Sequence, residues 1–443
     1  MPFRRRAMPA LLKNPLHASL LLALFGVVAH APANAGENSP YLLGDWGGKR
    51  SALADRGVSF EFGHTSETAR NRSGGVRELT RYTDQWKLGA VVDLDKTWGW
   101  TGSAFQVMFT HRGGDNLGAD AGIGNNQLIQ EVYGRGQTWH LTVFALSQDL
   151  FGGKANLRIG RLPVGEDFAG FSCDFMSLTF CGAPPGNIAG DYWVNWPTSQ
   201  WAARIKLDTG ADTYLKIGAY QLNPKYVDDA YAERNGWKPD FPSGTTGALI
   251  PVEFGWTPKL GGRPGSYKIG GWYSNAGGAD LFYDRDRQPR ALTGGDPLQR
   301  GSRYGGFLSL RQQLSGDSDR SGASVFLNLT QADRNTSATD RQIALGVTYK
   351  GVFQRPNDYV GLAFGATHAG ARAADHQRLF NRLHPQSAAP VKDGNEYVTE
   401  VFYNWSPIAS VSLRPNLQYI RHPGGTDANR DAFIVGLKTN IDF

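Results

Sequence analysis

Residues 431–443, DAFIVGLKTNIDF, alternate between apolar and polar side chains up to the last residue of the chain. The apolar positions of this stretch are Phe433, Val435, Leu437, Ile441 and Phe443. Gly436, Lys438, Asn440 and Asp442 share the opposite face. A period of two places successive side chains on opposite faces of a β-strand. The stretch therefore predicts a strand with one face in an apolar medium and the other in water.

The same alternation recurs along the chain in about sixteen runs of roughly ten residues. The predicted strands are 57–66, 82–95, 102–112, 138–148, 155–163, 200–208, 212–222, 247–257, 266–275, 302–314, 323–333, 341–351, 357–368, 395–405, 410–421 and 431–443.

The connections between these strands alternate in length. The short ones are 96–101, 149–154, 209–211, 258–265, 315–322, 352–356 and 406–409. The intervening ones are mostly long and comprise 67–81, 113–137, 164–199, 223–246, 276–301, 369–394 and 422–430, with 334–340 as a short exception. Short turns at one end of a sheet and long loops at the other are typical of outer-membrane barrels.

These patterns predict an all-β fold, namely a transmembrane antiparallel β-barrel of about sixteen strands with short periplasmic turns and long outer loops. In hydrocarbon every backbone N–H and C=O group must be paired, and only helices and closed barrels achieve this. A soluble β-sandwich array is the alternative, since its strands also alternate. The alternating connection lengths favour the barrel.

The N-terminus of the chain has the features of a signal peptide. A basic stretch at 4–6 precedes an apolar stretch at 20–28, and Ala33-Asn34-Ala35 is a cleavage motif. The apolar stretch is too short to span a bilayer and is the only one of its kind, which excludes a helical membrane protein. We expect a signal peptide at 1–35, a short periplasmic segment at 36–56 and a barrel at 57–443, located in the outer membrane of a Gram-negative bacterium.

The net charge of the chain is +6, with 46 Lys and Arg against 40 Asp and Glu. Four basic residues and no acidic ones lie in the signal peptide, so the mature chain has 42 against 40, a net charge of +2. This balance excludes a strongly basic surface for nucleic acid. The expected partners are outer-membrane lipid and, through Phe443, the barrel assembly machinery, because Phe443 is similar to the C-terminal aromatic residue of outer-membrane barrels.

The sequence contains no G-x-S-x-G, C-x-x-C, Walker or H-E-x-x-H motif. His368, His376 and His384 are evenly spaced, but a spacing of eight residues suits neither one helix face nor a zinc site. We therefore expect neither a metal nor a cofactor, and no enzymatic activity. A barrel enzyme with a Ser/His/Asp arrangement, or a surface-binding scaffold, is the alternative from another functional class.

Cys173 and Cys181 lie in the longest predicted loop, 164–199. Exported proteins fold in an oxidising compartment, so we expect a disulfide between these cysteines rather than two free thiols. A loop of this length is more often functional than idle. The disulfide would hold its shape if the loop folds inward and narrows the pore.

The water-facing strand positions carry the chemistry for transport. They hold Arg112, Arg158, Arg204, Arg303, Arg311, Arg414, Lys206, Lys216, Lys268, Lys350, Lys438, Glu61, Asp93, Asp208, Glu253 and Glu400. Any water-filled lumen is charged, whereas a sugar path also needs forked donors, carboxylate acceptors and aromatic faces. The near balance of charge in the mature chain suits a neutral polyol better than a strong anion.

Several motifs together resemble a known family. They are GDWGGKRSALADRGV at 44–58, Gln130-Glu131 with GQTW at 136–139, LRIGRLPVGEDFA at 157–169 with the two cysteines after it, WPTSQWAARI at 196–205 and YQLNP at 220–224. The chain is similar to the carbohydrate-selective porins of Gram-negative outer membranes, the OprB type. The resemblance spans the mature chain, with its specific motifs mainly in 44–224.

The resemblance implies passive, selective diffusion of small neutral sugars of the glucose type through a pore constricted by loops. It points to Arg112 and Glu131 as sugar ligands, although His111 stands where the family has Asn before the arginine. Arg161 and Asp167 either join the sugar path or fix the constricting loop, and Arg204 completes the predicted path. A general or sugar-acid porin is the alternative function. A homotrimer is the usual porin assembly, and a monomer is equally compatible with the sequence.

Overall fold

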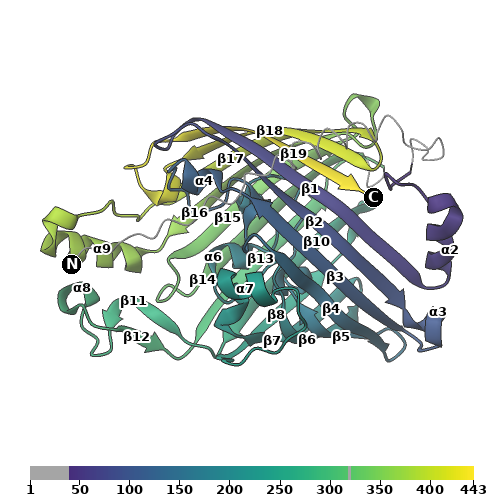
Figure 1. The fold of residues 1–443 in the computed structure, drawn as a ribbon, viewed down its shortest axis with the longest axis horizontal. Helices are drawn as coiled ribbons and strands as arrows, with labels where there is room; N and C mark the ends of the chain where they lie inside the picture. The colour runs from purple at the N-terminus through teal and green to yellow at the C-terminus, as the bar shows by residue number, and fades with distance from the viewer. Residues whose placement is uncertain (1–38, 318–320) are drawn as a thin grey trace.

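The computed structural model describes residues 39–317 and 321–443, so the predicted signal peptide lies outside the described residues. One antiparallel sheet contains 17 strands, of which β9 (Lys259–Leu260) is a two-residue strand beside a turn. The last strand of the chain pairs with the first, which closes the other sixteen strands into a barrel (Figure 1). The fold predicted from the alternation is confirmed.

The sixteen strands of the wall agree with the predicted runs. They are β1 (Val58–Ser73), β2 (Thr80–Asp93), β3 (Ser103–Gly114), β4 (Trp139–Leu150), β5 (Ala155–Leu162), β6 (Gln200–Gly210), β7 (Thr213–Leu222), β8 (Gly247–Trp256), β10 (Arg263–Ser274), β13 (Arg303–Gln313), β14 (Gly322–Ala332), β15 (Thr339–Lys350), β16 (Tyr359–Ala369), β17 (Asn395–Ile408), β18 (Val411–Arg421) and β19 (Ala432–Asp442).

One predicted connection is wrong. The segment 67–81 was expected to be a long loop, but β1 continues to Ser73 and leaves only 74–79 between β1 and β2. The added part of β1 pairs with both β2 and β19. Its sequence, ETARNRS, is polar on both faces, so it lacks the apolar alternation by which the other strands are recognised.

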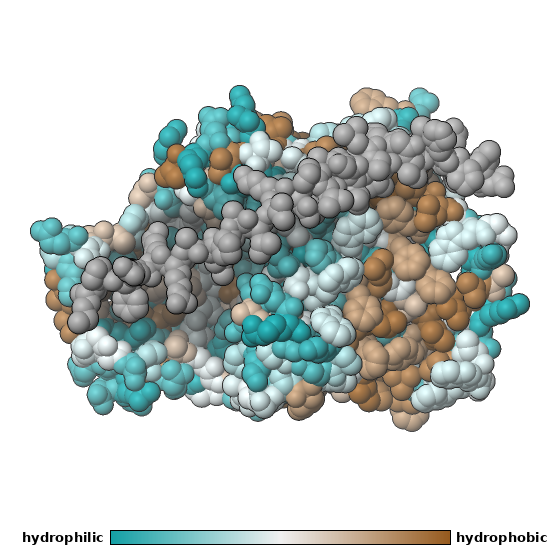
Figure 2. Space-filling view, viewed as in Figure 1, coloured by the Kyte–Doolittle hydropathy of each residue, from teal (hydrophilic) through white to brown (hydrophobic). Residues whose placement is uncertain are grey.

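The two faces of the wall differ as the alternation predicts. On β19, Val435 and Leu437 point outward with 42% and 41% of their surfaces exposed, while Lys438 between such positions is 2% exposed and faces the lumen. Figure 2 shows hydrophobic side chains gathered over β1 to β5, toward the end of the barrel that carries the short turns. Hydrophilic side chains predominate at the opposite end.

Short helices occupy the connections and the N-terminal segment. They are η1 (Trp46–Gly48), α2 (Lys49–Asp55), α3 (Leu94–Trp98), α4 (Leu117–Asp120), η2 (Glu131–Tyr133), α5 (Val164–Asp167), η3 (Leu178–Phe180), α6 (Pro184–Ile188), η4 (Pro224–Val227), α7 (Asp229–Asn235), α8 (Arg290–Thr293), η5 (Val352–Gln354), α9 (Ala371–Leu383), η6 (Pro385–Ser387) and η7 (Pro423–Gly425). A small hairpin of β11 (Gly278–Asp284) and β12 (Pro297–Arg300) lies in the connection predicted at 276–301. Within the described residues, no helix has the length and apolar character needed to cross a membrane.

The segment before β1 lies at the short-turn end of the barrel, where α2, α3 and the C-terminus are found (Figure 1). Asp45 Oδ1 accepts hydrogen bonds from the backbone N–H and the hydroxyl of Ser51, in the first turn of α2. Arg50 of α2 donates to the carbonyl oxygens of Phe443 at 2.6 Å and of Phe60 at 2.9 Å. These contacts join the segment to β1 and to the residue after β19, the two strands that close the barrel.

Three long loops, L2 to L4, surround the site. L2 (115–138) joins β3 to β4, L3 (163–199) joins β5 to β6, and L4 (223–246) joins β7 to β8. Side chains of L3 pack in two apolar clusters against inward-facing wall residues, as Trp193 does against Trp272 and Phe175 against Phe402. L3 therefore fills part of the lumen.

Candidate functional site

The lumen narrows to a cavity of about 910 Å³ between the barrel wall, L2 and L3. The wall contributes mainly polar and basic side chains, including Thr65, Gln85, Arg112, Lys268, Arg311 and Asn440. L2 contributes Glu131 and Arg135, and L3 contributes Glu166, both cysteines and Trp196. A passing solute therefore meets donors, acceptors and one indole ring in a confined space.

Arg112 and Glu131, both predicted as sugar ligands, meet in this cavity. Arg112 Nη2 lies 3.5 Å from Glu131 Oε2, and its Nη1 donates to the carbonyl oxygens of Glu131 and Gly134 at 3.1 and 3.0 Å. Arg112 thus binds both the side chain and the backbone of L2. It fixes the position of Glu131 in the pore.

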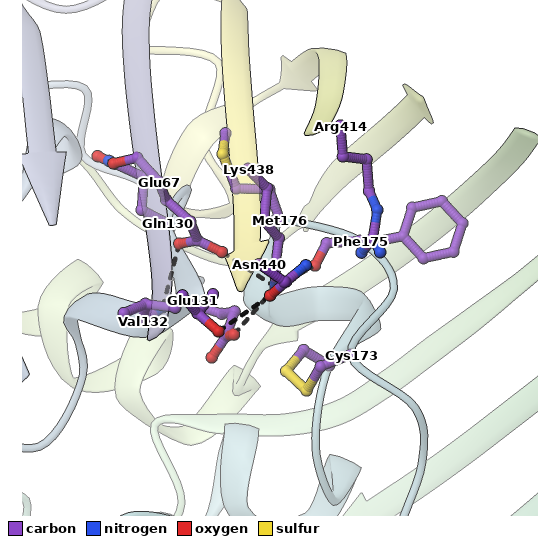
Figure 3. A network of polar contacts seen from close by, with 12 residues as sticks. Glu67, Gln130, Glu131, Val132, Cys173, Phe175, Met176, Arg414, Lys438 and Asn440 are labelled. Atoms are coloured by element: carbon purple, nitrogen blue, oxygen red, sulfur yellow. Dashed lines mark hydrogen bonds and ion pairs between the residues drawn. A yellow bond between two sulfur atoms is a disulfide. The ribbon is translucent and has the colours of Figure 1, made fainter. Parts of the chain in front are cut away.

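Lys438 completes a network of charges around Glu131 (Figure 3). Its Nζ lies 3.1 Å from Glu131 Oε1 and 3.1 Å from Glu67 Oε1, and it donates to the carbonyl oxygen of Phe175 in L3. The second oxygen of Glu67 accepts from the backbone N–H of Val132 at 3.2 Å. Burial alone would raise the pKa of Glu131, but the charges of Lys438 and Arg112 outweigh it and lower that pKa. The carboxylate therefore stays ionised in the pore.

Other wall carboxylates hold L3 in the same way. Glu400 accepts from the backbone N–H groups of Met176 and Ser177, each at 2.8 Å, and Glu253 accepts from that of Ala169 at 2.7 Å. Charge-assisted hydrogen bonds of this kind are stronger than neutral ones. Glu253 and Glu400, which the sequence shows only as charges of a water-filled lumen, therefore hold L3 in place.

The predicted disulfide between Cys173 and Cys181 is confirmed. Both cysteines line the cavity. Their sulfur atoms and a carboxylate oxygen of Glu131 lie within 4.8 Å of one another. Figure 3 shows the disulfide below the network of charges, near Glu131. The disulfide therefore shapes the part of L3 that faces Glu131.

Asp167 and Arg204 lie behind this surface. Asp167 Oδ1 is 3.1 Å from both Arg158 Nη1 and Arg204 Nε, and its Oδ2 accepts from the Tyr220 hydroxyl at 3.2 Å. Neither Asp167 nor Arg204 is among the described residues that line the cavity. Their contacts fix the start of L3 to β5, β6 and β7, which is the structural role that the sequence left open for Asp167.

Arg161 lies at the outer end of β5, opposite Trp201 of β6. It donates to the carbonyl oxygen of Ser199, at the end of L3, at 2.9 Å, and its Nη1 is 3.8 Å from Asp240 Oδ1 in L4. Its guanidinium also lies over the ring of Tyr226 in L4. Arg161 therefore fixes L4 and the end of L3, and it does not line the cavity among the residues described.

Sequence reasoning missed four residues of the site. Gln85 Oε1 accepts hydrogen bonds from both Trp196 Nε1 and Arg112 Nε, each at 2.9 Å, which places an indole beside the guanidinium. Trp196 is the first residue of the motif WPTSQWAARI, and Arg135 directly precedes the motif GQTW. These motifs are the sequence features that could have identified both residues. Glu67 fell in the segment wrongly expected to be a loop.

A closed barrel of sixteen strands, with a polar lumen narrowed by inward-folded loops, defines a porin. The chain belongs to the carbohydrate-selective porin, OprB family, whose model matches residues 77–443. It is 42% identical over 436 residues to Porin B of Pseudomonas aeruginosa, covering 94% of each chain. It also matches the high-pH structure of Pseudomonas putida OprB with a TM-score of 0.88 and 36% identity, covering 92% of this chain and 99% of the other. The protein is thus a sugar porin of the Gram-negative outer membrane.

Proposed function

We propose that neutral monosaccharides cross this pore passively by exchanging their water shell for contacts with Arg112, Glu131 and Arg135. The observation that carries the proposal is the Arg112–Glu131 pair, which joins β3 to L2 and faces the cavity beside the disulfide of L3. Guanidinium groups donate to sugar hydroxyls, and a carboxylate accepts from them. Arg112 and Glu131 together present donors and an acceptor side by side, which suits the hydroxyl groups of a neutral polyol.

Trp196 supplies the apolar contact in this proposal. Its indole lines the cavity and is held next to Arg112 by their common partner, Gln85. An aromatic face suits the apolar side of a pyranose ring. Since each contact is weak, the sugar can leave as readily as it enters, as permeation requires.

The remaining expectations belong to the same proposal. The protein acts as a channel without a cofactor and not as an enzyme, and its outward side chains contact outer-membrane lipid. Phe443, whose ring stacks on that of Trp86 with centroids 5.8 Å apart, presents the C-terminal aromatic residue to the assembly machinery. Segments 1–35 and 36–56 are a signal peptide and a periplasmic element. The mechanism holds for a monomer or a homotrimer, since each barrel encloses its own pore.

Planar-bilayer recordings with glucose test the proposal. Arg112→Ala and Glu131→Ala should each reduce the block of ion current by glucose, while an open-channel current shows that the barrel has formed. A double variant that glucose blocks as strongly as wild type would refute the assigned site. Reversal potentials in a salt gradient test the sugar-acid alternative, because such a porin would show clear anion selectivity.

A further inference from the structure

We propose a second sugar-binding site, the outer site, between L2 and L4 at the loop end of the barrel. It rests on the proposed function, since it would load the constriction with sugar. The site is a separate cavity of about 290 Å³, lined by Tyr133, Arg135 and Gln137 of L2 and by Tyr226 and Asp229 of L4. This volume is at the lower end of ligand pockets, roughly 300 Å³. The cavity therefore suits a ligand as small as a single sugar ring.

The side chains of the outer site offer the three kinds of contact that a sugar needs. Tyr133 provides an aromatic ring, Arg135 a forked donor and Asp229 an acceptor. Neither the guanidinium of Arg135 nor the carboxylate of Asp229 makes a hydrogen bond to another residue of the described chain. Both groups are therefore available to hydroxyl groups of a ligand.

The outer site carries charges of both signs, because its lining holds Arg135 together with the carboxylates of Asp228, Asp229 and Glu233. Burial and the nearby charge of Arg112 lower the pKa of Arg135, while Asp191 and Asp229 act in the opposite direction. Asp229 Oδ1 also lies only 3.1 Å from where a Cβ on Gly136 would stand, so L4 approaches the L2 backbone closely at this point. Gly136 has a φ of +81° there, a conformation that glycine adopts without strain.

Arg135 connects the outer site to the constriction. It is the residue that lines both cavities, the smaller one with Asp229 and the larger one with Glu131. Its φ of +77° is a strained value for a residue with a side chain, and such strain clusters at ligand sites. A sugar moving inward can thus keep its contact with Arg135 while it exchanges Asp229 for Glu131.

The L4 wall of the outer site is held in place without a ligand. The Tyr226 hydroxyl donates to Gln221 Oε1 at 2.7 Å, and its ring lies 4.8 Å from the Arg161 guanidinium. The backbone N–H of Leu141 on β4 donates to the carbonyl oxygen of Gly236 at 2.8 Å. A preformed wall lowers the entropic cost of binding.

The test is single-channel recording on barrels of known orientation, with glucose added to one side at a time. Tyr133→Ala and Asp229→Asn should lower the rate of glucose association from the loop side about 3- to 10-fold, as expected for loss of one aromatic or polar contact. Association from the turn side and the open-channel conductance should remain as in wild type. Tyr133→Phe keeps the ring and Asp55→Asn removes a carboxylate from α2 at the opposite mouth, so both should behave as wild type.

Each result is decisive. Wild-type association rates from both sides in Tyr133→Ala and Asp229→Asn would overturn the outer site, and so would an equal loss from both sides, which indicates damage to the constriction. If the proposed function itself were wrong, glucose would not block the wild-type channel from either side. This result differs from both outcomes that would overturn the outer site.

Discussion

Lys438 on the last strand lies 3.1 Å from Glu131 in L2, 307 positions earlier in the chain, and only 2% of the lysine is exposed. The same ammonium group lies 3.1 Å from Glu67 on the first strand. One buried cation therefore holds the constriction loop at the seam where the barrel closes.

Replacing this cation should destabilise the protein. Lys438→Met leaves the carboxylates of Glu67 and Glu131 without their shared partner, and loss of one member of a buried ion pair costs about 3–5 kcal/mol. Urea unfolding followed by tryptophan fluorescence should show this decrease in the free energy of unfolding. Lys438→Met combined with Glu67→Gln removes one of the unpaired charges and should recover part of it. Wild-type stability of the single variant would contradict the assigned role.

Reduction of the disulfide should widen the pore and leave the barrel intact. The bridge closes a short loop and stabilises it by about 2–3 kcal/mol on the chain-entropy model, and both cysteines line the cavity. Liposome swelling should therefore show a higher maltose-to-glucose ratio after treatment with dithiothreitol. The Cys173→Ser/Cys181→Ser variant should show the higher ratio without reductant and no further change with it. A ratio that dithiothreitol leaves unchanged in wild type would argue against L3 as the size filter.

Removal of the indole at the constriction should change which polyols pass. Trp196→Leu keeps an apolar side chain but loses the flat face, so glucose should lose its advantage over mannitol, an open-chain polyol, by about 2- to 10-fold in swelling rate. Trp196→Phe retains a ring and should keep most of the preference. An unchanged ratio of glucose to mannitol in Trp196→Leu would show that the indole does not contact the sugar.

The contact between α9 and the β11–β12 hairpin should resist mild acid. Burial alone would raise the pKa of Asp280, but hydrogen bonds from Arg372, from the backbone N–H groups of Tyr283 and Phe282, and from Arg300 lower it. A lowered folded pKa stabilises the folded form above the unfolded value of about 3.9, and this stabilisation is lost as the pH falls through the folded value.

Hydrogen exchange of α9, corrected for the intrinsic pH dependence, measures this contact. Exchange in wild type should stay slow at pH 5 and increase only below about pH 3.9. Asp280→Asn should exchange fast already at pH 7, because Arg372 and Arg300 lose their charged acceptor. Slow exchange in that variant at pH 7 would show that other contacts hold α9.

Much of the fold could be predicted because strand periodicity is local. In β19, Val435 and Leu437 lie on one face and Lys438 on the other whatever the rest of the chain does. The strand at 67–73 could not be predicted in this way, because β1 carries Glu67 and Asn71 on one face and arginines on the other, and no set of apolar residues marks one face.

The site was predicted only in part. Arg112 and Glu131 were identified through a resemblance, and they do meet in the cavity. Trp196 and Arg135 lie at motifs of the family, but no local pattern shows which residues of L3 and L2 face the lumen. Arg161 and Asp167 are close in the sequence, yet Arg161 holds L4 and the end of L3, whereas Asp167 holds the start of L3.

The sequence alone determined the class of the molecule: an exported barrel whose strands have one lipid-facing and one water-facing side, with a disulfide in its longest loop. These features depend on composition and on residues a few positions apart. The tertiary structure decided which lumen charges face the sugar and which hold the loops. Glu67, Glu131 and Lys438 meet only when the first and last strands pair, and Glu400 reaches Ser177 across 223 positions only when L3 enters the lumen. Burial requires each of these charges to find a partner, and barrel closure determines which partner is within reach.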